Sequence, residues 1–440
     1  MRYDETLGKT FECKFCPKEH QVLTEKLIYQ DDALDLLVPT LNKYLSKDSL
    51  IAVIADTRTQ KILGQEVIQI LSKNKIKVIS KIVPDINNHS PVCDEQTKNF
   101  LLNSIPDVQC LIAVGSGVIN DLCKWVSFAK DIPYFSFATA ASMNGYPSTN
   151  VAASVNGVKC LIQAKSPLVV FALPKIIQQA PFELTAAGLG DALAKPVSSA
   201  DWKVNQFLFN DYYCSFIVDM VAELEKGYLE NPAGIKSKDP DAIEALFKTL
   251  FYSGIAMSIA GTSAPASGGE HLLSHSLDML AGRDKQEHDL HGRQVGLGTI
   301  LSAALYDLIL KQNKITWQPL NNEIDFPFWG DLAPEVNQHF QNKQARALLA
   351  LEKLQQPQTW PELKNELAAF IKTPELIKTT LKSAGAAHLI TDIGDYSLDS
   401  FTRIWQHSYQ MRSRFTILDL AQMAGIMPHS ASNLISQWLI

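Results

Sequence analysis

One aspartate and four histidines are candidate ligands of a divalent metal. Asp191 directly follows a predicted glycine bend, at the start of a helical run from residue 192, and the histidines His271, His275, His288 and His291 follow further along the chain. Two imidazoles and one carboxylate with an open position form a Lewis-acid site that suits Zn²⁺, Fe²⁺, Ni²⁺ or Mn²⁺. Small residues beside Asp191, His271 and His291 let helix backbones come close, which would bring these distant side chains to one point.

The histidines do not all have the same prospects as ligands. His271 and His275 lie one helical turn apart on the same face, so this pair could itself bind a metal, with His275 in place of His291. His288, three residues before His291, is a third alternative or a proton relay. Spacing alone does not choose among them.

A glycine turn earlier in the chain has the features of a phosphate-binding corner. The apolar run 110–114 predicts a short strand, Gly115-Ser116-Gly117 follows, and residues 118–126 have apolar side chains at helical spacing. Strand, glycine turn and helix aim free backbone N–H groups at an anion. The third glycine of the dinucleotide-binding pattern is replaced by Asn120, so a plain tight turn is the alternative.

An acidic residue ends another predicted strand. The buried run 49–55 leads into Asp56, and an acid at this position can accept hydrogen bonds from both hydroxyls of an adenosine ribose. Thr59 and the helical run after it indicate a helix cap instead, and both roles can hold together. A 2′-phosphate would be repelled by Asp56 and attracted by Arg58, which leaves NAD or NADP open.

The length and pattern of the chain predict two domains, one to hold the phosphate-binding corner and one to hold the metal ligands. A chain of 440 residues is too long for one ordinary core. Alternating strands and helices up to about residue 180 predict an α/β nucleotide-binding domain with a parallel sheet over residues 1–180. The later segments have helical period and few strand-like runs, which predicts an all-helical metal and substrate domain over residues 181–440. The expected later helices are 192–205, 212–229, 240–260, 271–280 and 292–310.

Composition excludes several classes of function. Hydrophobic content is 46%, charged content 20% and the net charge −6, with no basic block, so a nucleic-acid partner is not expected. No apolar run of transmembrane length and no signal core is seen, and seven scattered cysteines suit a reducing compartment, so a cytoplasmic location is expected. Cys13, Cys16 and His20 suggest a zinc knuckle. A second ligand pair is missing, so this segment is interpreted as an extension of unknown role.

The order of several motifs carries a family resemblance. From about Ile51 onward the chain resembles the iron- or zinc-dependent polyol dehydrogenases related to dehydroquinate synthase, and among them the bacterial sn-glycerol-1-phosphate dehydrogenase branch. The motifs that match are 115–121, Thr139-Ala140-Ala141-Ser142, 188–191 with Asp201-Trp202, 269–271, 291–296 and 411–420.

The resemblance implies the ligands of the metal and the cofactor. It carries the metal-ligand role onto Asp191, His271 and His291, with zinc favoured and nickel or iron as alternatives. It implies NAD or NADP bound by the backbone around Gly115, Ser116 and Gly117, with Thr139 and Ser142 hydrogen-bonded to the cofactor. It also favours the ribose role for Asp56 with Thr59, and a role for Asp121 in orienting the cofactor loop.

The resemblance further implies reduction of dihydroxyacetone phosphate to sn-glycerol 1-phosphate. One departure bears on this activity. The family usually has an aspartate where this chain has Asn144. An asparagine can form hydrogen bonds but cannot take up and release a proton as a carboxylate does, which puts the usual substrate or full activity in doubt. Asn144 and His288 are the expected catalytic residues, and Asn144 and Lys159 the expected substrate-binding ones. Candidate cations for the phosphate are Lys159, Arg293, Arg412 and Arg414.

Three other functions remain open on these residues. A polyol dehydrogenase for a non-phosphorylated substrate would need no phosphate-binding cation. A cyclising lyase like dehydroquinate synthase uses a denser set of basic residues, and the matching stretch here is lean in Lys and Arg. A non-enzymatic relative that binds only nucleotide is the third. A small phosphorylated ketone and other copies of this chain, in a homo-oligomer, are the expected partners, without membrane insertion.

Overall fold

The chain folds into two compact units. The computed structural model describes residues 3–86, 90–155 and 157–440. The first unit consists of Met1–Thr185 and Ser237–Thr262, and the second of Ala186–Lys236 and Ser263–Ile440. The sequence predicted a domain boundary at residue 180, whereas the contacts assign the segment Ser237–Thr262 to the first unit.

That segment contains helix α10 (Pro240–Ala260), most of whose residues are apolar. It is long and apolar enough to span a membrane, so the expectation that no apolar run reaches this length was wrong, but 78% of its apolar window is buried inside the fold. Phe247 packs on Tyr29 and Tyr146, and Ser258 donates a hydrogen bond of 2.7 Å to the carbonyl of Pro147. A helix with this much apolar surface is expected to be buried, and these contacts make α10 a core helix of the first unit.

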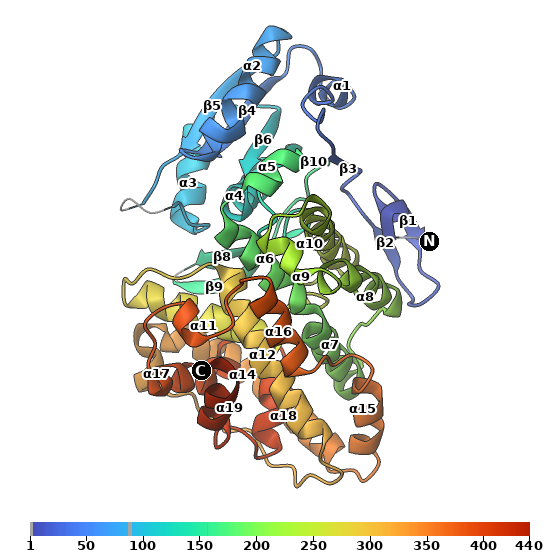
Figure 1. The fold of residues 1–440 in the computed structure, drawn as a ribbon, viewed down its shortest axis with the longest axis vertical. Helices are drawn as coiled ribbons and strands as arrows, with labels where there is room; N and C mark the ends of the chain where they lie inside the picture. Colours follow the sequence, from blue (N-terminus) through green and yellow to red (C-terminus); the bar gives the residue numbers. More distant parts are fainter. Residues whose placement is uncertain (1–2, 87–89, 156) are drawn as a thin grey trace. The chain divides into compact units, whose positions relative to one another are not determined.

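The first unit is built on a six-stranded parallel sheet with the order β3-β10-β7-β6-β4-β5, drawn in blue to green in Figure 1. The strands are β3 (Lys26–Tyr29), β4 (Leu50–Asp56), β5 (Lys77–Val83), β6 (Cys110–Gly115), β7 (Tyr134–Ala138) and β10 (Val169–Ala172). The predicted α/β class with a parallel sheet is therefore confirmed. Strand β3 was not predicted, because it is a short edge strand inside a stretch that reads as amphipathic.

The central strands are continuous apolar runs because both faces of the sheet are covered. Every residue of β6 and β7 is buried. Alternate residues of each strand enter different cores, so Ile112 belongs to one cluster and Leu111 to the other. Parallel sheets with helices on both faces have this pattern.

The sheet reverses its winding between β4 and β6. Strand β4 pairs with β5 on one side and with β6 on the other, and all these pairs are parallel. The chain therefore winds outward in opposite directions from this point. In open α/β sheets, ligands bind outside the carboxyl ends of the strands at such a reversal.

The other elements of the first unit are two antiparallel hairpins and short helices. The hairpins are β1 (Thr10–Glu12) with β2 (Glu19–Gln21), and β8 (Asn150–Val155) with β9 (Val158–Gln163). The helical elements are η1 (Tyr3–Thr6), α1 (Leu37–Leu41), η2 (Gln60–Gly64), α2 (Gln65–Lys73), α3 (Glu95–Ser104), α4 (Gly117–Lys130) and α5 (Pro174–Gln179).

The described residues of the second unit form helices and no strand, in agreement with the predicted all-helical domain. Helix α6 (Phe182–Leu193) contains the boundary between the units. The longer helices that follow are α7 (Lys195–Phe209), α8 (Ser215–Leu229), α11 (Gly269–Arg283), α12 (His291–Leu310), α14 (Ala333–Leu354), α16 (Pro374–Ser383) and α17 (Leu398–His407). The shorter ones are α9 (Pro232–Lys236), α13 (Phe326–Trp329), η3 (Gly330–Leu332), α15 (Thr359–Leu367), η4 (Ile390–Asp392), η5 (Ser408–Met411), α18 (Ile417–Met423) and α19 (Ala431–Leu439).

One local prediction about Asp191 was wrong. The glycines before it were expected to form a bend, with a helix from residue 192. Instead Gly188, Gly190 and Asp191 all lie inside α6. Gly190 is tolerated in this helix because the backbone carbonyl of Gly292 occupies the space that a side chain would need.

Candidate functional site

Three side chains of the second unit meet in one cluster. Asp191 on α6, His271 on α11 and His291 at the start of α12 each offer a ligand atom, and these atoms all lie within 4.8 Å of one another. Asp191 is 1% exposed, and its Oδ1 lies 3.5 Å from Nε2 of His271. Two ring nitrogens and a carboxylate oxygen at this spacing fit a divalent cation with a position left for a further ligand.

Glu270 holds the ring of His271. Its Oε1 lies 2.7 Å from Nδ1 of His271 and accepts a hydrogen bond of 2.7 Å from the backbone N–H of Gly268. An ionised carboxylate only accepts hydrogen bonds, so Nδ1 carries the proton and Nε2 keeps its lone pair on the side of Asp191. A carboxylate that orients a metal-binding histidine in this way also raises the basicity of the ligand.

Ser274 and Gln294 hold the ring of His291 by the same logic. The hydroxyl of Ser274 donates to Oε1 of Gln294 at 2.7 Å and lies 2.8 Å from Nδ1 of His291. Because the single hydroxyl proton is used on Gln294, Ser274 accepts from Nδ1–H, and Nε2 keeps its lone pair. Sequence reasoning missed both residues. Ser274 lies one turn after His271 and Gln294 three residues after His291, but only helix packing makes those spacings meaningful.

Three glycines let the helices that carry the cluster touch backbone to backbone. A Cβ on Gly292 would lie 1.9 Å from the carbonyl oxygen of Ala187, and one on Gly190 2.0 Å from that of Gly292. A Cβ on Gly298 would lie 2.3 Å from the carbonyl oxygen of Glu270. The small residues noted in the sequence therefore act as expected, because they remove the side chains that would keep α6, α11 and α12 apart.

The other two candidate histidines lie outside this cluster. The ring of His275 is centred 5.9 Å from that of His271 and stacks on His291 at 5.5 Å. Its Nδ1 lies 3.3 Å from the guanidinium of Arg412. The side chain of His288 is 40% exposed and lies 3.4 Å from Asp278. Within the described residues, the group around Asp191 that has metal-binding spacing contains His291 and neither of these alternatives.

Charges around the cluster favour an ionised Asp191. Burial alone would raise the pKa of this carboxyl, but the nearby Lys195 and His271 hold it well below its usual range. The buried Nζ of Lys195 lies 3.8 Å from Oδ1 of Asp191 and donates a hydrogen bond of 2.8 Å to the backbone carbonyl of Asp191. For His271, burial works to lower the pKa, while Asp191 and Glu270 raise it above its ordinary value.

Asp201 on α7 anchors the start of α11. Its Oδ2 accepts from the backbone N–H of Gly269 at 2.7 Å, and its Oδ1 from that of Ile417 at 2.7 Å and from Tyr306 Oη at 2.6 Å. Burial and the charge of Glu270 raise the pKa of Asp201 to about 8. This buried group ties the C-terminal segment to the helix that carries His271.

In the first unit, the residues expected to bind the cofactor follow the carboxyl ends of adjacent strands. Asp56 ends β4, Gly115 ends β6, and Thr139 follows β7, with its backbone N–H bonded to the carbonyl of Gly115 at 3.2 Å. Helix α4 then begins at Gly117, and its N-cap residue Ser116 makes no side-chain capping bond. The first N–H groups of α4 therefore face the sheet's winding reversal, where a pyrophosphate is favoured.

Asp56 has the capping role that the sequence left as an alternative. Its Oδ1 accepts from the backbone N–H groups of Arg58 at 2.8 Å and Thr59 at 2.7 Å. Arg58 in turn forms a two-pronged ion pair with Asp85, with nitrogen–oxygen distances of 2.7 and 3.2 Å. The cation that would attract a 2′-phosphate is therefore already neutralised by a carboxylate.

Lys124 ties the turn helix to the loop that follows β7. Its ammonium is buried, lies 2.9 Å from Asp121, and donates to the carbonyls of Gly145 and Asn150 at 2.6 and 3.1 Å. This loop carries the buried Ser142 and the half-buried Asn144. Asp121 thus acts on the loop through Lys124, a residue whose importance the sequence did not reveal. Lys159 lies half-buried on β9.

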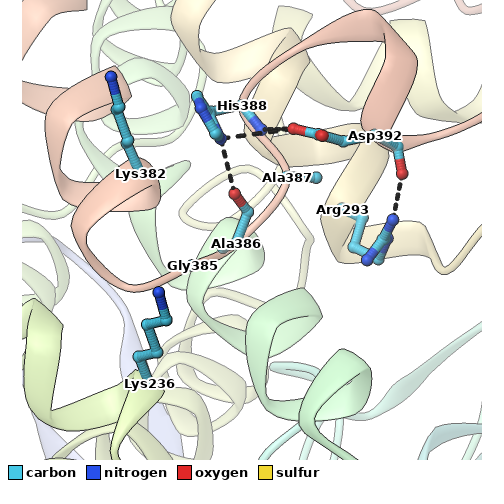
Figure 2. Close-up of a pocket in the computed structure, with 8 residues that line it drawn as sticks. All are labelled: Lys236, Arg293, Lys382, Gly385, Ala386, Ala387, His388 and Asp392. Atoms are coloured by element: carbon cyan, nitrogen blue, oxygen red, sulfur yellow. Dashed lines mark hydrogen bonds and ion pairs between the residues drawn. The ribbon is translucent and has the colours of Figure 1, made fainter.

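The candidate phosphate cations of the second unit differ in what they already bind. Arg293 lines a pocket of about 300 Å³ and donates a hydrogen bond to the backbone carbonyl of Asp392 (Figure 2). The residues that line this pocket do not include Asp191, His271 or His291. Arg293 also pairs with Asp289 at 2.8 Å. Arg414 is half-buried and donates hydrogen bonds to the hydroxyl of Ser263 at 3.1 Å and to the carbonyl of Ser267 at 2.5 Å. Arg412 is the one whose guanidinium lies beside a histidine that packs on the cluster.

Comparison with known proteins identifies the class of this chain. A family model described as iron-containing alcohol dehydrogenase matches residues 31–181. The fold resembles the crystal structure of glycerol dehydrogenase from Schizosaccharomyces pombe, with a TM-score of 0.60, 15% identity, and coverage of 98% of this chain and 94% of that one. It also resembles maleylacetate reductase from Rhizobium, with a TM-score of 0.57, 12% identity, and coverage of 96% and 97%. The fold is that of the iron-containing alcohol dehydrogenases, which are oxidoreductases acting on CH–OH groups.

Sequence relatives place the chain within that class. Glycerol-1-phosphate dehydrogenase (NAD(P)+) from Bacillus licheniformis is 33% identical over 304 residues, 69% of this chain and 74% of that protein. The enzyme of the same name from Geobacillus stearothermophilus is 29% identical over 424 residues, 94% of this chain and 96% of that protein. The chain belongs to the glycerol-1-phosphate dehydrogenase family, and the resemblance found in its motifs is confirmed.

Proposed function

We propose that this protein reduces dihydroxyacetone phosphate to sn-glycerol 1-phosphate with NADH or NADPH, using a divalent cation held by Asp191, His271 and His291. The observation that carries the proposal is the cluster of these three side chains, in which both imidazoles are held through Nδ1. Its relatives named glycerol-1-phosphate dehydrogenase support the same substrate pair.

The donor set fits such an ion. Both imidazoles are held through Nδ1, the three ligand atoms lie within 4.8 Å of one another, and Lys195 offsets the negative charge of Asp191. When bound, a divalent cation supplies a Lewis acid that stabilises the negative charge developing on the substrate oxygen as hydride arrives. Glu270, Ser274 and Gln294 fix the ring orientations, so little reorganisation is needed when the ion binds.

For the substrate phosphate, we propose Arg412. Its guanidinium lies 3.3 Å from His275, whose ring stacks on His291, so this cation is one side chain away from the cluster. Arg293 and Arg414 are bound to carboxylates or carbonyls that lock their positions. Asn144 and Lys159 remain proposed substrate contacts of the first unit, and the amide of Asn144 can position a hydroxyl without transferring a proton.

For the cofactor, we propose a preference for NAD over NADP. Asp56 supplies a carboxylate at the position suited to ribose hydroxyls, and Asp85 neutralises Arg58. Thr59, Thr139, Ser142 and the Gly115–Gly117 turn complete the proposed cofactor contacts. The composition further favours a cytoplasmic enzyme without a nucleic-acid or membrane partner, and homo-oligomerisation remains a proposal.

The test is a turnover assay on metal-loaded protein. Oxidation of NADH and NADPH is followed with dihydroxyacetone phosphate and, separately, with dihydroxyacetone. The proposal expects turnover mainly with the phosphorylated ketone, loss of turnover in His271→Ala with retained nucleotide binding, and a raised KM for the phosphorylated ketone in Arg412→Ala. Equal turnover of both ketones would assign a non-phosphorylated polyol instead. Nucleotide binding without turnover of either would favour a binding protein.

A further inference from the structure

The N-terminal hairpin contains a second group of metal-ligand side chains. Strands β1 and β2 pair antiparallel with Phe11 opposite His20, and the backbone N–H of Cys13 bonds the carbonyl of Lys18 at 3.3 Å. The loop between the strands therefore holds Cys13 and Cys16, and the register places His20 beside that loop. The two cysteines and the histidine, for which the sequence indicated no role, therefore lie together at one end of the hairpin.

The donor atoms of this turn are close enough to share an ion. A thiol sulfur from Cys13, another from Cys16 and a ring nitrogen of His20 lie within 4.8 Å of one another. Cys16 Sγ lies 3.3 Å from His20 Nε2. In tetrahedral zinc sites, bond lengths of about 2.0 to 2.3 Å put neighbouring ligand atoms roughly 3.5 Å apart. The backbone N–H of Phe15 donates a hydrogen bond of 3.4 Å to Cys13 Sγ, which holds this sulfur in the turn.

The histidine is held as a metal ligand would be. His20 is 1% exposed, and its ring packs edge-on against Phe11 at 5.5 Å. Its Nε2 lies 3.3 Å from the sulfur of Cys16, so this nitrogen faces the two thiols of the turn. Strand β2, which carries His20, contacts α10, so the hairpin packs on the core helix of the first unit.

We propose that Cys13, Cys16 and His20 bind a structural Zn²⁺ ion that orders the N-terminal hairpin of the first unit. Two soft thiolates with one imidazole select zinc, whereas the cluster at Asp191 has no sulfur donor. Three donors of the hairpin leave the fourth tetrahedral position to a donor outside it. The ion would join the loop of the hairpin to His20 on β2, the strand that contacts α10, and would order residues that otherwise rely on short strands.

Metal content of the full chain separates the two sites. The wild-type protein, purified with zinc and reductant, should carry two equivalents of divalent metal. Cys13→Ser/Cys16→Ser should lose one, and His271→Ala should lose the other. Cys160→Ser, which removes a half-buried thiol of β9, is the matched control and should keep both. Equal metal content in the knuckle variant and the control would overturn the proposal.

Cobalt substitution and stability give readouts that do not depend on activity. In His271→Ala protein loaded with Co²⁺, the proposal expects tetrahedral ligand-field bands and thiolate-to-cobalt charge-transfer absorption, and both should vanish when Cys13→Ser/Cys16→Ser is added. A chelator should lower the Tm of His271→Ala by several degrees and leave the combined variant unchanged. If the double serine variant fails to fold, the cobalt spectrum of the His271→Ala protein still decides. A spectrum without thiolate bands, or a Cys13–Cys16 disulfide that persists under reductant, would contradict the site.

Discussion

At the scale of single residues, the candidate metal cluster depends on groups that do not touch the ion. Glu270 and Ser274 each take the Nδ1 side of one histidine, so the Nε2 atoms can face Asp191 together. Without these partners an imidazole can adopt either tautomer and rotate. The side chains that orient the ligands therefore matter nearly as much as the ligands themselves.

The role of Glu270 can be tested with an isosteric change. Glu270→Gln keeps the shape but replaces a charged acceptor with an amide, so His271 loses part of its basicity and its fixed tautomer. We expect the affinity for the divalent cation to fall by about 10- to 100-fold. The affinity is measured by competition with a metallochromic chelator. His288→Ala is the control, because this side chain is 40% exposed and outside the cluster. Unchanged affinity in Glu270→Gln would remove its proposed role.

Cofactor choice can be tested at Asp85. Asp85→Asn removes the carboxylate that pairs with Arg58 and leaves this guanidinium available to a 2′-phosphate. We expect kcat/KM with NADPH to rise several-fold relative to NADH, measured by initial rates with both cofactors. Asp48→Asn removes a comparable exposed ion pair with Lys77 and should leave the ratio unchanged. An unaltered ratio in Asp85→Asn would show that Arg58 lies away from the ribose.

At the scale of elements, the distances between helix backbones decide whether the cluster exists. Helices α6, α11 and α12 approach through Gly190, Gly292 and Gly298, where any side chain would overlap a neighbouring backbone carbonyl. Backbone atoms cannot rotate away as the end of a flexible side chain can. A larger residue at these positions must therefore move a whole helix, and with it one of the ligands.

Gly298→Ala tests this close approach. Its Cβ would lie 2.3 Å from the carbonyl oxygen of Glu270, next to His271. We expect a loss of about 1–3 kcal/mol in the free energy of unfolding together with weaker metal binding, measured by denaturant titration and metal competition. Gly282→Ala is the control, since Gly282 lies on α11, the helix that carries Glu270, and nothing lies within 4 Å of a Cβ built on it. It should be neutral or stabilise slightly, because alanine favours helix. Equal effects at both sites would refute the argument.

At the scale of the whole molecule, the two candidate sites belong to different units. The residues proposed for the cofactor lie in the first unit, at the carboxyl ends of β4, β6 and β7, and the metal cluster lies in the second. Each is built from contacts within its own unit. Nucleotide binding and metal binding should therefore be separable in experiment.

Metal removal tests that separation. Protein stripped by a chelator should lose turnover of dihydroxyacetone phosphate but bind NADH with a Kd within a few-fold of that of the metal-loaded protein. Binding is measured by calorimetry or by NADH fluorescence, and turnover should return when Zn²⁺, Ni²⁺ or Fe²⁺ is added back. A large loss of NADH affinity on metal removal would show that the two sites do not act separately.

The sequence by itself determined the fold class, the family and most of the strands that carry the cofactor site. Buried parallel strands are continuous apolar runs, and glycine turns after them are visible in the order of residues, so β4, β6 and the Gly115–Gly117 turn were predicted correctly. Apolar periodicity likewise located α10 and α12. These features depend on residues that are close together along the chain.

Only the tertiary structure decided which side chains meet. It distinguished His291 from His275 and His288, and it showed that Glu270, Ser274, Gln294 and Lys124 support the sites. It also moved α10 into the first unit and placed Asp191 inside a helix rather than after a bend. The physical reason is that helical periodicity defines the faces of one helix, whereas the distance between two helices depends on the backbone contacts that glycines allow when the chain packs.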